Sequence, residues 1–251
     1  MKILAAAITL MISVSTFAQV TADEIIDNYF ENIGGKEAFR ELKGQKMTAE
    51  VEAQGMSIPL EIYMMADGKT ITKLEVMGMS MSQDAFDGTD VWATNFMTQK
   101  AEKAEAEESE NKKRGIGEYP SPLLDYSDKG YSVELMEDEV VDGVDCYKLK
   151  LTKNPKLAEG EEVDDIEYYY FDQETFVPLK TETEIHSGQG KGTMVITLYS
   201  DYQEVDGMYF PFSMTFKSED SEGQLIQFDA IELNPDVTDD FFAFPSEDTE
   251  E

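Results

Sequence analysis

Residues 45–65, QKMTAEVEAQGMSIPLEIYMM, decide the fold of this chain, because apolar and polar side chains alternate through most of the stretch. A period of two is the pattern of a β-strand with one buried face. The break at Gln54 and Gly55 predicts a turn between two such strands. The apolar face of the resulting hairpin carries Met47, Ala49, Val51, Ala53, Ile58, Leu60, Ile62 and Met64.

The same alternation continues toward the C-terminus and is interrupted by Asp-Gly pairs at 67–68, 87–88, 142–143 and 206–207. Asp-Gly is a common turn between antiparallel strands. No alternation of strands with helices is present, so we predict a mainly β fold with a single curved antiparallel sheet. About eleven strands are predicted, over residues 45–53, 58–64, 70–81, 91–98, 131–136, 145–152, 166–171, 179–186, 192–202, 209–217 and 224–233.

Two short helices are predicted before the first strand. Thr21 and Glu24 have the spacing of a capping box, and Ile25, Ile26, Tyr29, Phe30 and Ile33 follow on one helical face. Residues 36–43 form a second, shorter helical pattern. At the other end, residues 234–245 contain three phenylalanines and are expected to pack against the domain.

The first eighteen residues have the parts of a signal peptide. Lys2 precedes an apolar run over 3–14, and the stretch ends in Thr16-Phe17-Ala18. We predict cleavage after Ala18, export to the periplasm, one domain over 19–245 and a disordered acidic tail over 246–251. An uncleaved N-terminal anchor is the alternative. The single cysteine, Cys146, lies far beyond the apolar run, so neither lipid attachment there nor an internal disulfide is expected.

The charge balance limits the possible partners. The chain has 53 acidic and 20 basic residues, which gives a net charge of −33. Such a field repels phosphate, so nucleic acid and anionic membrane surfaces are not expected as partners. Strong acidity also keeps proteins soluble in saline habitats, so the charge alone does not indicate a basic partner.

No catalytic motif is recognisable in the sequence. Zinc sites need several histidine or cysteine ligands, and the chain has only His186 and Cys146. It has no Gly-x-Ser-x-Gly elbow, and the glycine-rich stretch 188–192 joins two predicted strands. We therefore predict a non-enzymatic protein without a cofactor. A hydrolase that uses two of the many carboxylates is a third hypothesis, because their abundance makes them uninformative.

Residues 100–125 interrupt the strand pattern. Residues 100–114 are rich in Ala, Glu and Lys, which is typical of a solvated helix or a mobile loop. They are followed by Tyr119-Pro120-Ser121-Pro122-Leu123-Leu124, in which the prolines fix a bend and the leucines require burial. A polar segment that leads to an apolar plug has the composition of a lid over a cavity.

The predicted sheet interior is rich in methionine beside aromatic residues. Methionine adapts its shape, so such a surface accommodates ligands without a fixed shape. A plain packed core explains the same residues, and the sequence leaves both interpretations open. An open sheet of this size must curl, and two short helices would leave part of its concave face uncovered.

Three further stretches make the chain similar to the LolA-like, outer-membrane lipoprotein-sorting proteins of double-membraned bacteria. They are the opening helix 22–29 with residues 33–35; the turn 170–172 with residues 176–179; and residues 201–211, DYQEVDGMYFP. The ending, residues 231–234 followed by 241–245, is also typical. These are motifs of a fold and carry no catalytic signature.

The resemblance implies an incomplete, half-barrel sheet with an N-terminal helix and short lid helices at its mouth. It implies a monomeric periplasmic carrier that holds the acyl chains of lipoproteins or other lipids. The alternative is a non-catalytic envelope sensor or structural module that binds a protein partner. Lys46 is the candidate for the basic residue that controls cargo release. The predicted lining of the lipid cavity is Met47, Val51, Ile58, Leu60, Ile62, Met64, Leu74, Val76, Trp92, Phe96, Leu123, Leu124, Tyr170, Met194, Ile196, Phe212, Met214 and Phe216.

Overall fold

The structure is a computed structural model that describes residues 20–53, 55–219, 221 and 223–245. The predicted signal peptide and the predicted acidic tail lie outside these residues. Among the helices described, none is long and apolar enough to cross a membrane.

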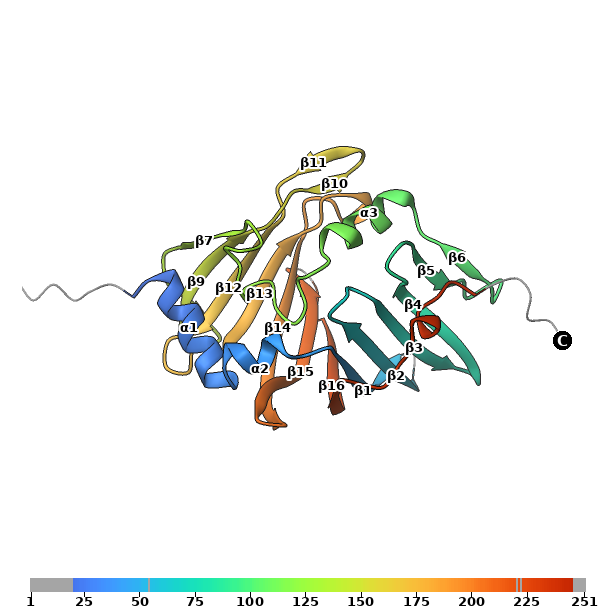
Figure 1. Ribbon diagram of the computed structural model, residues 1–251, viewed down its shortest axis with the longest axis horizontal. Coiled ribbons are helices and arrows are strands. Elements are labelled where there is room, and N and C mark those ends of the chain that lie inside the picture. Colours follow the sequence, from blue (N-terminus) through green and yellow to red (C-terminus); the bar gives the residue numbers. More distant parts are fainter. Residues whose placement is uncertain (1–19, 54, 220, 222, 246–251) are drawn as a thin grey trace, which may run out of the picture.

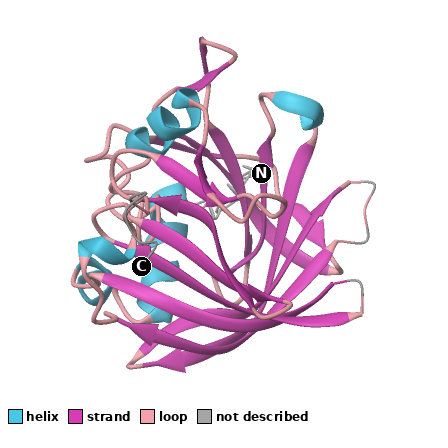
Figure 2. Ribbon diagram, turned by 90° about the vertical axis from the view of Figure 1, so that its right-hand side faces the viewer, coloured by secondary structure: helices cyan, strands magenta, loops and turns pink. Residues whose placement is uncertain are grey.

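An antiparallel sheet of fourteen strands dominates the described chain (Figure 1). Its two edge strands, β6 and β7, do not pair with each other, so the sheet curves without closing (Figure 2). The predicted fold class is confirmed. The strands of this sheet are β1 (Gly44–Ala53), β2 (Met56–Met65), β3 (Thr70–Val76), β4 (Met79–Phe86), β5 (Val91–Thr94), β6 (Ala101–Lys103), β7 (Ser132–Leu135), β8 (Glu139–Val141), β9 (Val144–Thr152), β12 (Ile166–Asp172), β13 (Pro178–Glu184), β14 (Met194–Val205), β15 (Met208–Ser218) and β16 (Gln224–Leu233).

The strand order is β6-β5-β4-β3-β2-β1-β16-β15-β14-β13-β12-β9-β7, with β8 paired to β9. The first and last long strands therefore meet in the middle of the sheet, where Met47 lies opposite Ile231. A separate hairpin, β10 (Lys156–Ala158) with β11 (Glu161–Val163), stands beside the large sheet. All the pairs are antiparallel, as the Asp-Gly turns predict.

The strands outnumber the eleven expected because several are only three or four residues long and one turn was missed. The predicted strand 70–81 is two strands joined at Met77 and Gly78, whose φ angles are 54° and 78°. A positive φ favours glycine, but methionine is an unusual turn residue. The pair Met-Gly therefore gives a weak signal inside an apolar run.

The helices are α1 (Ala22–Ile33), α2 (Lys36–Arg40) and α3 (Ala106–Arg114), with short 3₁₀ turns at η1 (Gly188–Gly190) and η2 (Asp239–Phe241). The predicted capping box starts α1: the Glu24 amide donates to Thr21 Oγ1 at 3.2 Å, and the Thr21 amide donates to Glu24 Oε2 at 2.8 Å. The helix thus begins where the sequence predicts.

One face of the sheet, called here the concave face, carries α1 and α2 (Figure 1). The ring of Tyr29 on α1 lies 5.5 Å from that of Phe171, and Phe39 on α2 lies 5.7 Å from Phe210. Leu123 and Leu124 join the same core. The helices and the leucine segment plug one half of the hollow.

The C-terminal segment packs on the opposite, convex face. Phe242 is 2% exposed, and its carbonyl accepts a hydrogen bond from Trp92 Nε1 at 2.9 Å. The ring of Phe241 lies 4.7 Å from that of Tyr63. The expected packing of this segment is confirmed, and it gives the convex face a core of its own.

Candidate functional site

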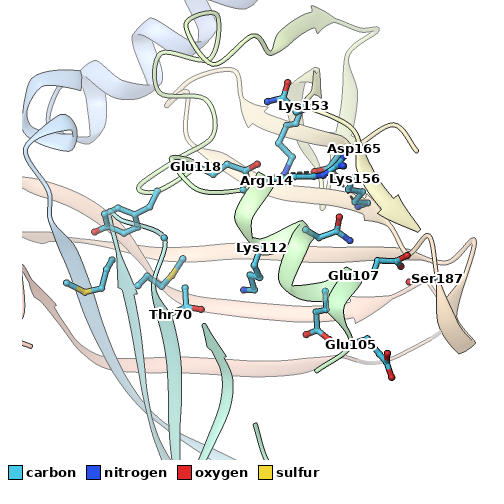
Figure 3. A pocket seen from close by; sticks show the side chains of 18 residues that line it. Thr70, Glu105, Glu107, Lys112, Arg114, Glu118, Lys153, Lys156, Asp165 and Ser187 are labelled. Carbon is cyan, nitrogen blue, oxygen red and sulfur yellow. Dashed lines mark hydrogen bonds and ion pairs between the residues drawn. The ribbon is translucent and has the colours of Figure 1, made fainter. Parts of the chain in front are cut away.

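A cavity of about 680 Å³ lies beneath α3 (Figure 3). One wall comes from the end of β2 and the start of β3, with Met64, Met65 and Thr70. The facing wall comes from the end of β9 and the start of β12, with Lys153 and Asp165. The cavity therefore joins two arms of the sheet that are far apart in the strand order. The remaining lining residues are Gly68, Glu105, Glu107, Glu108, Asn111, Lys112, Arg114, Gly115, Glu118, Tyr119, Asn154, Lys156 and Ser187.

The α3 helix is fixed to the β10–β11 hairpin by side chains that reach backbone groups. Asn111 Nδ2 donates to the Leu157 carbonyl at 2.8 Å, and Asn111 Oδ1 accepts from the Leu157 amide at 2.7 Å. Glu107 accepts from the amides of Glu159 and Gly160 at 3.1 and 2.7 Å. This pairing satisfies backbone groups that a short hairpin would otherwise leave to solvent.

On its other side α3 is joined to β5. The Val91 amide donates to the buried Ser109 hydroxyl at 2.9 Å. The helix thus spans from one arm of the sheet to the other and forms the roof of the cavity. A helix was one of the two predicted forms of this segment, but the anchoring residues Ser109 and Asn111 were not predicted, because a polar side chain in a polar run carries no contact signal.

Most charged groups in the cavity wall are paired. Lys153 Nζ lies 3.1 Å from both Glu118 Oε2 and Asp165 Oδ2, and Lys156 Nζ lies 2.9 Å from Asp165 Oδ1. Burial would raise the pKa of Asp165, but Lys153 and Lys156 outweigh burial and hold that pKa below its usual range. These pairs fix the position of the wall and leave its charge nearly balanced.

Lys112 and the Tyr119 hydroxyl in the wall have no such partner in the described chain. Lys112 makes no ion pair with the residues that the structure describes, and Figure 3 shows its side chain directed from α3 into the cavity. The Tyr119 hydroxyl is buried and has no hydrogen-bond partner among those residues. The sequence did not single out either residue.

An apolar strip leads away from the cavity along the concave face of β2 and β3. Met64 lines the cavity, and Ile62 and Ile58 follow on the same face of β2. Leu74 on β3 lies opposite the buried Leu60. We define the apolar strip as Ile58, Ile62, Met64 and Leu74 on these two strands together with Met214 on β15; all five are only partly buried and pack against the main core.

The structure brings eleven of the predicted lining residues into one apolar cluster on the concave face, but only Met64 among them lines the cavity. Two more share this face by register: Val76 follows Leu74 at a spacing of two, and Phe216, 40% exposed, follows Met214. The eleven are Met47, Val51, Ile58, Leu60, Ile62, Met64, Leu74, Leu123, Leu124, Phe212 and Met214.

The structure places the other predicted lining residues elsewhere. Trp92 belongs to the convex core under Phe242. Tyr170 packs with Cys146, and the Lys180 ammonium lies 3.7 Å from its ring centroid. Tyr169 faces the concave core, so its neighbours Tyr168 and Tyr170 point to the convex face. Tyr168 lies opposite Glu182 on β13, and Glu182 lies opposite Ile196 on β14. Ile196, and Met194 two residues before it, therefore also lie on the convex face. Phe96 is 53% exposed in the turn after β5.

Lys46 also lies on the convex face. Its neighbour Met47 points into the concave core, and the Lys46 ammonium lies 2.6 Å from Glu61 Oε1 and 5.5 Å from the Tyr63 ring centroid. Any part of Lys46 in cargo release, which stays a prediction, would therefore be played from the convex face.

The concave face of β12–β14 is more polar than predicted. Glu167 and Tyr169 face this side, and Tyr199 OH lies 3.1 Å from Thr181 Oγ1. Burial raises the pKa of Glu167, although Lys153 opposes the shift. The sequence does not reveal these polar groups, because tyrosine counts as an apolar residue at every position of the run Tyr168-Tyr169-Tyr170.

No group of three or more histidine, cysteine, aspartate or glutamate side chains is arranged to hold a metal ion within the described residues.

Comparison with known proteins identifies the class of fold. A DUF1329 family protein from Desulfovibrio piger is 14% identical, with a TM-score of 0.53 over 88% of this chain and 96% of that one. A LolA superfamily protein from Nitrosomonas europaea is 16% identical, with a TM-score of 0.52 over 90% and 98%. A putative outer membrane lipoprotein-sorting protein domain from Vibrio parahaemolyticus is 13% identical, with a TM-score of 0.50 over 87% and 94%.

The chain therefore has the LolA-like fold, and the resemblance seen in its sequence is confirmed at this level. A family model described as an uncharacterized protein matches residues 124–245. No curated protein matches the chain.

Proposed function

We propose that this protein is a periplasmic carrier or binding protein that shields the acyl chains of lipoproteins or related lipids on its concave face. The apolar strip carries the proposal. Its five side chains are incompletely covered by the chain itself, and one of them, Met64, lines the cavity. A packed core has no reason to leave such a row accessible, whereas a reversible ligand site requires it.

The size of the hydrophobic effect supports a lipid ligand. Each methylene moved out of water gains about 0.8 kcal/mol, so an acyl chain of roughly twelve methylenes gains about 10 kcal/mol. A cavity of about 680 Å³ lies within the range of small-molecule sites, and the strip extends it. Methionines at 64 and 214 would adapt to a flexible chain.

The helical roof gives the proposed ligand a route of entry. The α3 helix contacts the β10–β11 hairpin through hydrogen bonds and through the ion pair of Arg114 with Glu162. Polar contacts exchange with water at a small net cost, so the roof would lift more readily than a buried apolar helix such as α1. Within the predicted lid, residues 100–125, the α3 helix would thus be the part that moves, because Leu123 and Leu124 belong to the main core.

Binding of a fluorescent fatty acid to residues 19–251 tests the proposal, with native mass spectrometry to identify lipid carried through purification. We expect saturable uptake, and we expect Leu74→Asp to abolish it because an unpaired charge on the strip repels an acyl chain.

Leu225→Asp is the matched control. This substitution introduces the same charge on the convex face, where Leu225 is 56% exposed and lies opposite Thr215. Uptake should survive in this variant. Absence of uptake by the wild-type protein, or equal loss in both folded variants, would rule out a lipid site on the concave face and favour a module that binds a protein partner.

A further inference from the structure

The basic side chains that line the cavity are paired with carboxylates except at one position. Of the four cations that line it, Lys153 and Lys156 pair with carboxylates, and Arg114 Nη1 lies 3.0 Å from Glu162 Oε1. The same Arg114 atom donates to the Pro155 carbonyl at 2.8 Å. Lys112 remains without an ion-pair partner in the described part of the chain.

Lys112 is half-buried and enters the cavity from the roof (Figure 3). The carboxylate one helical turn before it, on Glu108, is exposed, and Glu105 at the rim is exposed as well. These two carboxylates are therefore solvated, whereas the Lys112 ammonium faces a space with an apolar floor of Met64 and Met65. A cation in such a place attracts an anion from the ligand.

Tyr119 supplies a second unsatisfied group in the same cavity. Its ring packs against the concave core, and its hydroxyl is buried without a partner in the described residues. Burial raises the pKa of Tyr119, so the hydroxyl keeps its proton and remains a donor at neutral pH. Buried hydroxyls are normally hydrogen-bonded, so the unpaired hydroxyl of this cavity-lining residue is suited to a ligand acceptor.

We propose that the cavity is the headgroup chamber of a single-chain amphiphile with an anionic head, an inference that rests on the proposed function. The Lys112 ammonium is the counter-ion of the head, and the Tyr119 hydroxyl donates a hydrogen bond within the chamber. The tail leaves past Met64 along the apolar strip. The head is a carboxylate or a phosphate, since both offer the charged oxygens that these donors require.

Competition against a fluorescent fatty acid tests the headgroup, using mature protein and three competitors with the same acyl chain. Oleate and oleoyl lysophosphatidate carry anionic heads, and monoolein is neutral. We expect the anionic competitors to bind at least about tenfold more tightly than monoolein, the scale of one hydrogen bond to a charged group. The tighter of the two anionic competitors identifies a carboxylate or a phosphate source.

Lys112→Met should abolish this preference, so that the anionic competitors bind no more tightly than monoolein does to the same variant. Lys113→Met is the control, because Lys113 is the exposed neighbour and its loss changes the net charge equally. Tyr119→Phe should weaken oleate binding several-fold without lowering the melting temperature, because the ring remains and only an unpaired hydroxyl is removed.

The outcomes separate this inference from the proposed function. Equal affinities for oleate and monoolein, or a Lys112→Met protein that keeps the preference, would overturn the headgroup chamber while lipid binding stands. Oleyl amine, added as a fourth and cationic competitor, would also overturn it by binding more tightly than oleate, and that result would implicate Glu105 and Glu108. Failure of every amphiphile to bind would overturn both.

Discussion

The two halves of the concave face are built on the same sheet but differ in what covers them. Around β9 and β12 the hollow is plugged by α1 and α2, and Leu149, Leu151 and Phe171 are 0% exposed. Along β2 and β3 the same face carries the apolar strip, which no helix of the described chain buries completely. The comparison teaches that stability is concentrated in the plugged half, which frees the other half for a ligand.

The largest expected effect comes from removing a ring in the plugged half. Phe171→Ala should lower the free energy of unfolding by about 3–5 kcal/mol, because it deletes a fully buried ring that contacts Tyr29. Urea titration followed by fluorescence measures the change. Phe216→Ala removes the same ring from the uncovered end of β15, where Phe216 is 40% exposed, and should cost much less. Similar losses in both variants would break the comparison.

The fold was predictable because its signals are local and repeated. The alternation in 45–65 and the Asp-Gly turns specify antiparallel neighbours, and the Thr21–Glu24 pair specifies the start of α1. Short strands such as β6 and β10 were not predictable, because three residues contain too little periodicity to distinguish from a loop.

The site was less predictable, because an apolar residue in a strand does not reveal which face of the sheet it joins. The convex face has buried clusters of its own, one of them under the C-terminal segment. Trp92 and Tyr170 in these clusters therefore cannot be distinguished by sequence pattern from Leu60 in the concave core. The roof depends on contacts between distant polar residues, such as Asn111 with Leu157. Sequence spacing carries no information about such a pair.

The attachment of the roof offers a second test of the difference between the halves. Asn111→Ala removes both hydrogen bonds to Leu157, each worth about 0.5–1.5 kcal/mol. The loss should fall on α3 rather than on the whole domain. Hydrogen exchange should therefore quicken in 106–114 while α1 stays protected, and a fluorescent lipid should enter faster. Equal acceleration in α1 would mean that the roof and the plug unfold together.

Glu167 tests the electrostatics of the plugged half. Burial raises its folded-state pKa, so the folded protein binds a proton at this site more readily than the unfolded chain. The charged carboxylate therefore lowers stability as pH rises from about 4.3, the unfolded value, through the folded pKa. Glu167→Gln should stabilise the protein modestly at pH 7 and should lose this advantage below pH 4.

Thermal melts across this pH range would measure the effect, and Glu182→Gln is the opposed control. Burial would raise the pKa of Glu182, but Lys180 and Tyr170 outweigh burial and lower that pKa. The charge of Glu182 therefore stabilises the fold at pH values above the unfolded pKa. The Glu182→Gln variant should be less stable than the wild type at pH 7. A Glu167→Gln variant that was less stable than the wild type at pH 7 would contradict the assignment.

The smallest expected effect is that of Lys46→Met, which separates the two faces of one strand. The variant loses a partly exposed ion pair with Glu61, so its stability should change by about 1 kcal/mol or less. Its affinity for oleate should equal that of the wild type, because residue 46 points away from the side that Met47 faces. Lys112→Met carries the same chemical change on the cavity side and should lose affinity. If Lys46→Met lost it instead, the ligand would lie on the convex face, and the half of the sheet that we take to be open would have only a structural role.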